Sequence, residues 1–128
     1  MNVPKDLRYT KEHEWIRSKA GEVEVGITEY AQGELGDVIF VDLPPLGTKV
    51  AAMKGFGSID AVKTVSDLFA PVAGEIVAVN ESLKDNPALV NTSPYEQGWM
   101  VRIRVENPSD VNALLSADDY EKLLGAHA

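Results

Sequence analysis

The sequence predicts a mainly β protein. β-Branched and aromatic residues alternate with polar residues in several short stretches, and turns rich in Gly and Pro, such as "LPPLG" and "APVAG", separate these stretches. Few stretches have helical periodicity instead. This spacing favours a β-sandwich or flattened barrel over alternating βαβ units.

The predicted strands are short, and the last of them shows the alternation most clearly. In "VRIRV" the apolar positions alternate with Arg102 and Arg104, so we expect one buried and one solvated face, with the arginines in water rather than at a phosphate site. The predicted strands are Glu14 to Arg17, Val23 to Ile27, Val38 to Leu43, Phe56 to Val62, Val65 to Ala70, Glu75 to Val79 and Met100 to Val105.

Two helices are predicted from their capping residues. Thr28 can cap the segment "EYAQGEL", which Gly36 would end. Near the end of the sequence, Ser116 and Asp119 have the spacing of a capping box, and Gly125 is expected to end that helix. The apolar stripes of these helices would be Tyr30, Ala31 and Leu35 in the first, and Tyr120, Leu123 and Leu124 in the second.

Length and composition predict one domain over residues 1–128. A hydrophobic content of 45% is enough for a core, and the sequence shows neither a membrane-spanning apolar run nor a signal or transit pattern, which predicts a cytoplasmic protein. The net charge of -8 disfavours nucleic acid and favours partners with basic surfaces. The absence of cysteine excludes disulfides, thiolate nucleophiles and zinc-thiolate sites, so any sulfur chemistry requires an attached group.

Lys63 stands out because it is the only Lys or Arg between Lys54 and Lys84. The runs on both sides of it are apolar and alternating, so we expect a hairpin whose tip carries Lys63 exposed and free of contacts. An ordinary solubilising lysine is one interpretation of this pattern. A protonated lysine amine is a poor nucleophile, and Asp60 and Asp67 would stabilise its charge, so a functional Lys63 would be a tether rather than a catalyst.

The sequence resembles the H protein of the glycine cleavage system over nearly its whole length. The resemblance is carried by "LRYTKEHEWIR", "VGITEYAQGELGDVIFVDLPPLGT", "AVKTVSDLFAPVAGEIVAVN", "LVNTSPYEQGWM" and "LLSADDYEKLL", in the order found in that family. It implies a barrel-sandwich hybrid of the lipoyl- and biotinyl-carrier type. It also implies that Lys63 carries lipoic acid through an amide bond.

The resemblance further implies a carrier that is not itself an enzyme, with no catalytic residue and no metal. In the family, the arm accepts an aminomethyl group from glycine at a decarboxylase that uses pyridoxal phosphate. An aminomethyltransferase passes the carbon to tetrahydrofolate, and the FAD enzyme dihydrolipoamide dehydrogenase reoxidises the arm. A lipoyl-attaching enzyme is a fourth partner, and neither nucleic acid nor a membrane is expected.

The resemblance also implies roles for individual residues. Residues that match the family's cleft for the loaded arm are Glu12, Glu14, Ile27 and Asp67, and a carboxylate there could pair with the ammonium of the adduct. Asp60, Asp67 and Gly74 match positions expected to matter for lipoylation. Around the lysine the sequence reads "DAVKT", where the family commonly has Glu-Ser-Val-Lys-Ala, so modification could be less efficient.

Three alternatives remain open from the sequence. "AAMKG" is similar to the biotin-carrier motif and would place biotin on Lys54, although it lacks the second Met. The protein could instead relay lipoate to other enzymes. A free-standing enzyme would need a carboxylate pair, such as Glu22 with Glu24 or Asp118 with Asp119, but adjacent helix acids point apart and alternate strand acids usually mark a solvated face.

Overall fold

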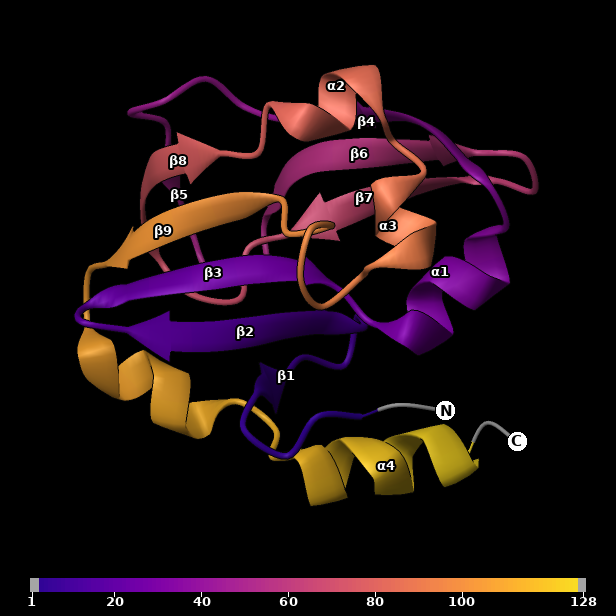
Figure 1. The fold of residues 1–128 in the computed structure, drawn as a ribbon. Helices are drawn as coiled ribbons and strands as arrows, with labels where there is room; N and C mark the ends of the chain where they lie inside the picture. The colour runs from indigo at the N-terminus through magenta and orange to yellow at the C-terminus, as the bar shows by residue number, and fades with distance from the viewer. Residues whose placement is uncertain (1–2, 127–128) are drawn as a thin grey trace.

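Two antiparallel sheets form the protein in a computed structural model, which describes residues 3–126 (Figure 1). The six-stranded sheet contains, in spatial order, β1 (Arg8–Tyr9), β2 (Glu14–Lys19), β3 (Glu22–Ile27), β9 (Val101–Val105), β8 (Gly74–Val79) and β5 (Lys49–Val50). The three-stranded sheet contains β4 (Val38–Asp42), β6 (Gly55–Ala61) and β7 (Val65–Phe69).

Short helices connect and flank the strands. They are α1 (Glu29–Leu35), α2 (Ser82–Asp85), α3 (Leu89–Thr92), the 3₁₀ helix η1 (Pro108–Ala113) and α4 (Ala117–Ala126). None of the helices within residues 3–126 is long and apolar enough to cross a membrane.

The predicted mainly β fold is confirmed, and all seven predicted strands are present with ends within two residues of the expected ones. Strands β1 and β5 and helices α2, α3 and η1 are too short for a periodic signal and were not predicted. The described strands form two separate sheets and no closed barrel. The fold therefore has the sandwich character of the predicted hybrid.

The core lies between and beneath the sheets. One cluster joins the inner face of the small sheet, represented by Val41, Ile59 and Leu68, to Ile27 and Met100 of the large sheet region. A second cluster continues along the large sheet, and a third lies under the C-terminal helix around Tyr9, Trp15 and Tyr120. The buried residues of β9, Val101 and Ile103, follow the period-2 alternation of its sequence, because successive strand side chains point to opposite faces.

The predicted helix caps are largely confirmed. The Thr28 hydroxyl accepts a hydrogen bond from the Ala31 N–H, and α1 ends before Gly36, which has φ of 78°. The Ser116 hydroxyl accepts from the Asp119 N–H at 3.2 Å. The prediction that Gly125 ends α4 is wrong, because the helix continues to Ala126.

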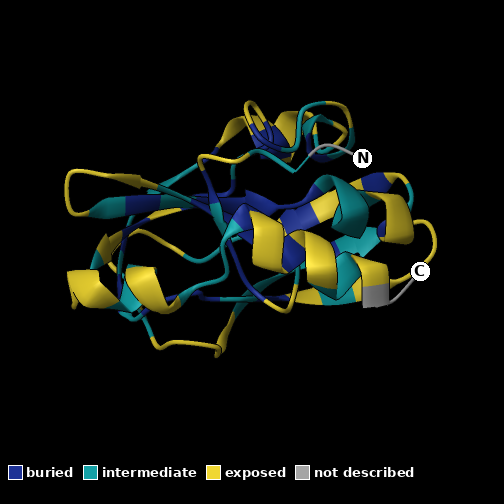
Figure 2. Cartoon of the chain, turned by 90° about the horizontal axis from the view of Figure 1, so that it is seen from below, coloured by how far each residue is buried: buried dark blue, intermediate teal, exposed yellow. Residues whose placement is uncertain are grey.

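The C-terminal helix is held by packing of its predicted apolar stripe as well as by its Ser116 cap. Ala117 and Tyr120 are buried, and the Tyr120 ring stacks on Tyr9 with centroids 4.6 Å apart. Figure 2 shows α4 with buried and exposed stripes along its length, as expected for a helix with one side on the protein. Tertiary packing of this side outweighs the weak helix propensity of one glycine.

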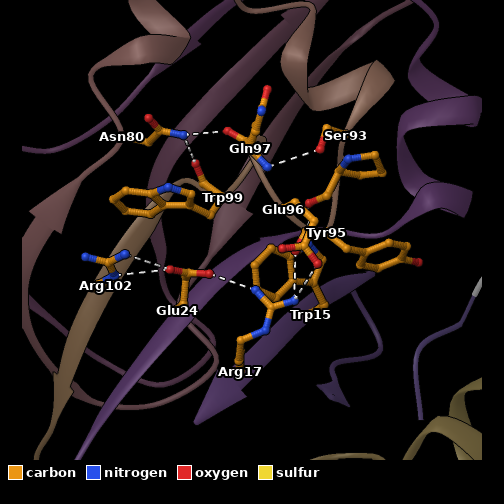
Figure 3. Close-up of polar contacts among 11 residues, drawn as sticks. Trp15, Arg17, Glu24, Asn80, Ser93, Tyr95, Glu96, Gln97, Trp99 and Arg102 are labelled. Atoms are coloured by element: carbon orange, nitrogen blue, oxygen red, sulfur yellow. Dashed lines mark hydrogen bonds and ion pairs between the residues drawn. The ribbon is translucent and has the colours of Figure 1, made fainter. Parts of the chain in front are cut away.

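The segment at residues 94–99 is anchored by part-buried hydrogen bonds from side chains of β2 and from Asn80 (Figure 3). The Trp15 indole N–H donates to the Pro94 carbonyl at 2.8 Å, and Arg17 donates to the Tyr95 carbonyl at 2.8 Å. The Asn80 amide donates to the Gln97 and Trp99 carbonyls from the other side. These contacts satisfy the loop carbonyls that no strand partner could reach.

Arg102 and Arg104 are exposed and form ion pairs, as expected for a solvated strand face. Arg102 pairs with Glu24 at 3.0 Å and lies over the Trp99 ring, and Arg104 pairs with Glu75 at 3.0 Å.

Candidate functional site

Lys63 lies in the turn of the hairpin formed by β6 and β7. This turn projects at one end of the molecule (right in Figure 1). The strands pair up to Asp60 with Val65, and the Ala61 N–H then donates to the Thr64 carbonyl across the turn at 3.0 Å. Val62, Lys63 and Thr64 are all exposed. The predicted hairpin and the exposure of its lysine are therefore confirmed.

The prediction that the tip is free of contacts is wrong. The Lys63 N–H donates to the Leu35 carbonyl at 3.2 Å, and the Val62 N–H donates to the Asp37 carbonyl at 2.9 Å. The aliphatic stem of Lys63 crosses Gly36 so closely that a Cβ there would lie 3.3 Å from the Lys63 Cγ. Two remote segments meet at the tip, which local sequence patterns cannot reveal.

Asn91 of α3 holds the segment on which the tip rests. Its side-chain oxygen accepts from the Val38 N–H at 2.9 Å, and its amide donates to the Gly36 carbonyl at 2.9 Å. The same amide donates to the Gln32 side chain at 3.0 Å. Because this side chain satisfies backbone groups on both sides of Asp37, it fixes the carbonyls that receive the hairpin tip.

A cleft of about 280 Å³ lies beside the hairpin, between α1, β7 and the start of β2. All four residues predicted to hold an arm line it: Glu12, Glu14, Ile27 and Asp67. Sequence reasoning did not assign the remaining lining residues to this site, although it placed three of them on one face of α1. They are His13, Tyr30, Ala31, Glu34, Leu35, Ile59, Ser66 and Leu68.

Glu14 is the buried carboxyl group of the cleft, with only 1% of its surface exposed. Burial raises the pKa of Glu14 to about 8, because a low-polarity environment disfavours the charged form. Hydrogen bonds from the Thr10 hydroxyl and the Phe69 backbone N–H oppose this effect. Glu14 is therefore mainly neutral at pH 7, and a cation entering the cleft would favour its ionised form.

His13 packs against two tyrosine side chains. Its Nδ1 lies 2.9 Å from the Tyr120 hydroxyl, and that hydroxyl lies 2.7 Å from the Thr28 hydroxyl. The His13 ring also lies against Tyr30, with centroids 4.8 Å apart. Tyr120 thus connects α4 to the cap of α1 and to one wall of the cleft.

The two other residues predicted to matter for lipoylation lie outside the cleft. Asp60 is half-buried on β6, opposite Phe40 and Val65. Gly74 begins β8 in the other sheet, where a Cβ would collide with the Arg104 carbonyl and the Ile103 side chain. Close packing of β8 on β9 is thus a structural reason for glycine at this position.

The carboxylate pairs considered from the sequence are engaged in ion pairs or lie apart from the cleft. Glu24 receives Arg17 at 2.8 Å and Arg102 at 3.0 Å. Asp118 receives Lys5 at 2.7 Å on the surface of α4. Lys54, the lysine of the biotin-like motif, precedes β6, whereas Lys63 follows it, so the two lie at opposite ends of that strand.

An exposed lysine on an antiparallel hairpin, with a carboxylate-lined cleft beside it, is consistent with the class of carrier proteins for a covalently attached group. The profile of the family described as "Glycine cleavage H-protein" matches residues 7–127. The chain belongs to this family.

Individual relatives agree with the family match. The glycine cleavage system H protein of Geobacillus thermodenitrificans is 54% identical over 124 residues, covering 97% of this chain and 98% of the relative. That of Listeria monocytogenes serotype 4b is 53% identical, covering 97% and 99%. The crystal structure of the glycine cleavage system H protein from Mycobacterium marinum superposes with a TM-score of 0.87 at 42% identity, covering 96% of this chain and 99% of that one.

The family is a non-catalytic carrier subunit of the glycine cleavage system, and its members hold lipoic acid covalently on a lysine. The chain therefore has the lipoyl-carrier role in glycine cleavage, and the free-standing-enzyme and biotin-carrier interpretations are not supported.

Proposed function

We propose that Lys63 is the lysine that carries the lipoyl group, and that residues 1–128 act as one cytoplasmic carrier domain. The observation that carries this proposal is the course of the Lys63 stem over Gly36. The residue before Gly36 is Leu35, which lines the cleft. An arm on Lys63 would begin beside the end of α1, where Leu35 lines the cleft.

The cleft fits a long arm that ends in a polar, cationic group. The apolar residues Ile27, Leu35 and Leu68 can cover an aliphatic chain and exclude water. Four carboxyl groups line the same cleft, those of Glu12, Glu14, Glu34 and Asp67. Of these we propose Glu14 and Asp67 as the partners of an ammonium group, because a charge-assisted hydrogen bond would hold it and shield it from water.

When attached, the lipoyl group supplies the dithiolane chemistry that a cysteine-free chain lacks. We propose that the partners are the pyridoxal-phosphate-dependent decarboxylase, the aminomethyltransferase that uses tetrahydrofolate, the FAD-dependent dihydrolipoamide dehydrogenase and the enzyme that attaches the arm. Tethering raises the effective concentration of the arm at each docked partner. Asp60 and Asp67 are proposed to aid recognition by the attaching enzyme, since both lie on the lysine hairpin.

Mass spectrometry of the digested protein tests the assignment. After incubation with a lipoyl-attaching enzyme, lipoate and ATP, one lipoyl group should be found on the peptide that contains Lys63. The variant Lys63→Arg should gain none and should fail to support exchange of bicarbonate into glycine with the three partner enzymes. Lipoate on Lys54, or exchange activity that survives Lys63→Arg, would overturn the proposal.

A relay of lipoate to other enzymes is the second candidate function, because it requires the same arm. Reconstitution separates the two roles. Full lipoylation without any bicarbonate exchange would favour the relay.

A further inference from the structure

A buried hydroxyl group lies behind the cleft, and the proposed carrier function does not yet use it. Tyr120 of α4 is 0% exposed and is not itself a residue of the cleft lining. Its hydroxyl lies 2.9 Å from the His13 Nδ1 and 2.7 Å from the Thr28 hydroxyl. His13 belongs to residues 12–14, which line the cleft just before and at the start of β2, and Thr28 is the N-cap of α1. We call residues 12–14 the turn wall and α1 the helix wall.

The backbone of the turn wall is strained at His13. Its φ is 71°, a left-handed conformation that is uncommon for residues other than glycine and that persists only where the surroundings hold it. On both sides of His13 the backbone is tied to one group, because the Thr10 hydroxyl accepts from the Glu12 and Glu14 N–H groups. The conformation of His13 therefore sets how the carboxyl groups of Glu12 and Glu14 face the cleft.

The turn wall and the helix wall are joined at two points. The Thr28 N–H donates to the His13 carbonyl at 3.0 Å, which joins the two backbones. The Thr28 hydroxyl accepts from the Ala31 N–H and contacts the Tyr120 hydroxyl, which in turn contacts the His13 ring. A ring of hydrogen bonds thus runs from His13 through Thr28 and Tyr120 back to His13, and such networks fix the geometry of the groups they join.

Tyr120 is placed by packing that does not depend on its hydroxyl. Its ring stacks on Tyr9, with the planes 6° and the centroids 4.6 Å apart. Tyr9 is equally buried, but its hydroxyl donates to the Pro4 carbonyl at 2.6 Å, and neither Tyr9 nor Pro4 lines the cleft. The two stacked tyrosines are therefore a matched pair that differs in what the hydroxyl contacts.

We propose that Tyr120 is a positioning residue for the arm cleft. Its hydroxyl holds His13 and the cap of α1 in one arrangement, so that the turn wall and the helix wall keep the spacing that encloses the loaded arm. Tyr120 does not touch the arm and acts through His13. This inference rests on the proposed function, because it requires that the arm on Lys63 lies in the cleft. It also extends the site to the C-terminal helix.

The cleft protects the adduct from water, so a misplaced wall should shorten its lifetime. Loss of the aminomethyl group consumes one water molecule. The bond between sulfur and the methylene carbon breaks, the sulfur takes a proton and becomes a thiol, and the methylene carbon and the nitrogen leave as formaldehyde and ammonium ion. A carboxylate held against the ammonium opposes this loss, and its effect depends on accurate placement.

Hydrogen exchange of the unmodified protein tests the positioning without any arm. The variant is Tyr120→Phe, which keeps the stacked ring, and Tyr9→Phe is the matched control. The Thr28 amide reports on the joint between the walls, because it donates to the His13 carbonyl. After correction for global stability from the slowest amides of β9, its exchange should be about five-fold faster in Tyr120→Phe and unchanged in Tyr9→Phe. Equal exchange in the two variants would refute the proposal.

The lifetime of the adduct is the second measurement. Each protein is fully lipoylated, loaded with glycine by the decarboxylase and separated from it, and the release of ammonia is followed with time. Loss should be about five-fold faster than wild type in Tyr120→Phe and within about two-fold of wild type in Tyr9→Phe. A wild-type rate in Tyr120→Phe, or an equal rise in Tyr9→Phe, is the result that contradicts the proposal.

A double-mutant cycle tests whether Tyr120 acts through His13. His13→Gly removes the ring and suits the positive φ. In this background Tyr120→Phe should accelerate loss of the adduct by less than about two-fold, because the group it positions is already gone. A full five-fold acceleration there would show that Tyr120 acts by another route, and the positioning role would fail.

Failure of the proposed function gives a different result. The adduct should be lost much more slowly from folded wild type than from the same loaded protein unfolded in urea. Equal rates would mean that the cleft does not hold the arm, which would refute the proposed function and this inference together. Slow loss from both wild type and Tyr120→Phe would refute this inference alone.

Discussion

The segment at residues 94–99 and the hairpin tip at residues 62–64 are both short connections, but they are held in opposite ways. Side chains of Trp15, Arg17 and Asn80 reach the carbonyls of residues 94–99, and the Trp15 ring is 0% exposed. At the tip, backbone N–H groups reach the carbonyls of Leu35 and Asp37, and the side chains remain in solvent.

Because of this difference, we expect the 94–99 segment to contribute mainly to the stability of the protein and the hairpin tip mainly to its function. Anchoring by side chains couples the 94–99 segment to the core, so its disruption exposes buried surface. Anchoring by backbone fixes the position of the tip while leaving its side chains available for a partner. Substitutions in the first region should therefore change the free energy of unfolding, and those in the second should change the handling of the arm.

The largest expected effect on stability comes from Trp15→Ala. This variant removes a fully buried ring and leaves the Pro94 carbonyl without its donor, so the free energy of unfolding should fall by about 3–5 kcal/mol. Urea denaturation measures the change. Lipoylation at temperatures where the variant is still folded should be close to wild type, and a strong loss there would contradict the separation of the two regions.

A pH-dependent effect is expected at Glu14, which lines the cleft at the start of β2. Because its folded-state pKa is raised to about 8, folding favours the neutral carboxyl, and this contribution to stability is lost as the pH rises from about 4.5 to about 8. Glu14→Gln is neutral at every pH. The stability of this variant relative to wild type should therefore increase across that window, by as much as a few kcal/mol.

Urea denaturation at a series of pH values between about 4 and about 9 measures this difference. A constant offset between Glu14→Gln and wild type over the whole range would show that Glu14 ionises in the folded protein as readily as in the unfolded chain.

The smallest effect on stability is expected from Gly36→Ala, and it comes with a change at the tip. The φ of 78° disfavours alanine by about 1–2 kcal/mol, and the new methyl group would press on the Lys63 stem. The rate of lipoylation should fall several-fold. Gly47→Ala is the matched control, because Gly47 has φ of 85° and a Cβ added there would have no neighbouring atom within 4 Å.

Comparable destabilisation with normal lipoylation is expected for Gly47→Ala. If both glycine variants were lipoylated at the wild-type rate, the contact between position 36 and the Lys63 stem would have no role in presenting the amine.

Local patterns in the sequence were sufficient for the strands, for the Thr28 and Ser116 caps and for the exposure of Lys63. They failed where a feature depends on contacts between distant segments. Gly125 continues α4 because Tyr120 packs on Tyr9, which outweighs the propensity of one glycine. The two-residue strands β1 and β5 exist only because a neighbouring strand pairs with them.

The sequence by itself determined which residues alternate between core and solvent, since side-chain direction in a strand has a fixed period of two residues. It also placed an isolated lysine between two such runs. Only the tertiary structure decided that Glu14 becomes a buried, mainly neutral acid, that the Lys63 stem crosses Gly36, and that Phe40 and Val65 share one face. Each of these properties depends on which distant segments pack together. The burial of a side chain, and the shift of its pKa that burial causes, arise only after that packing has formed.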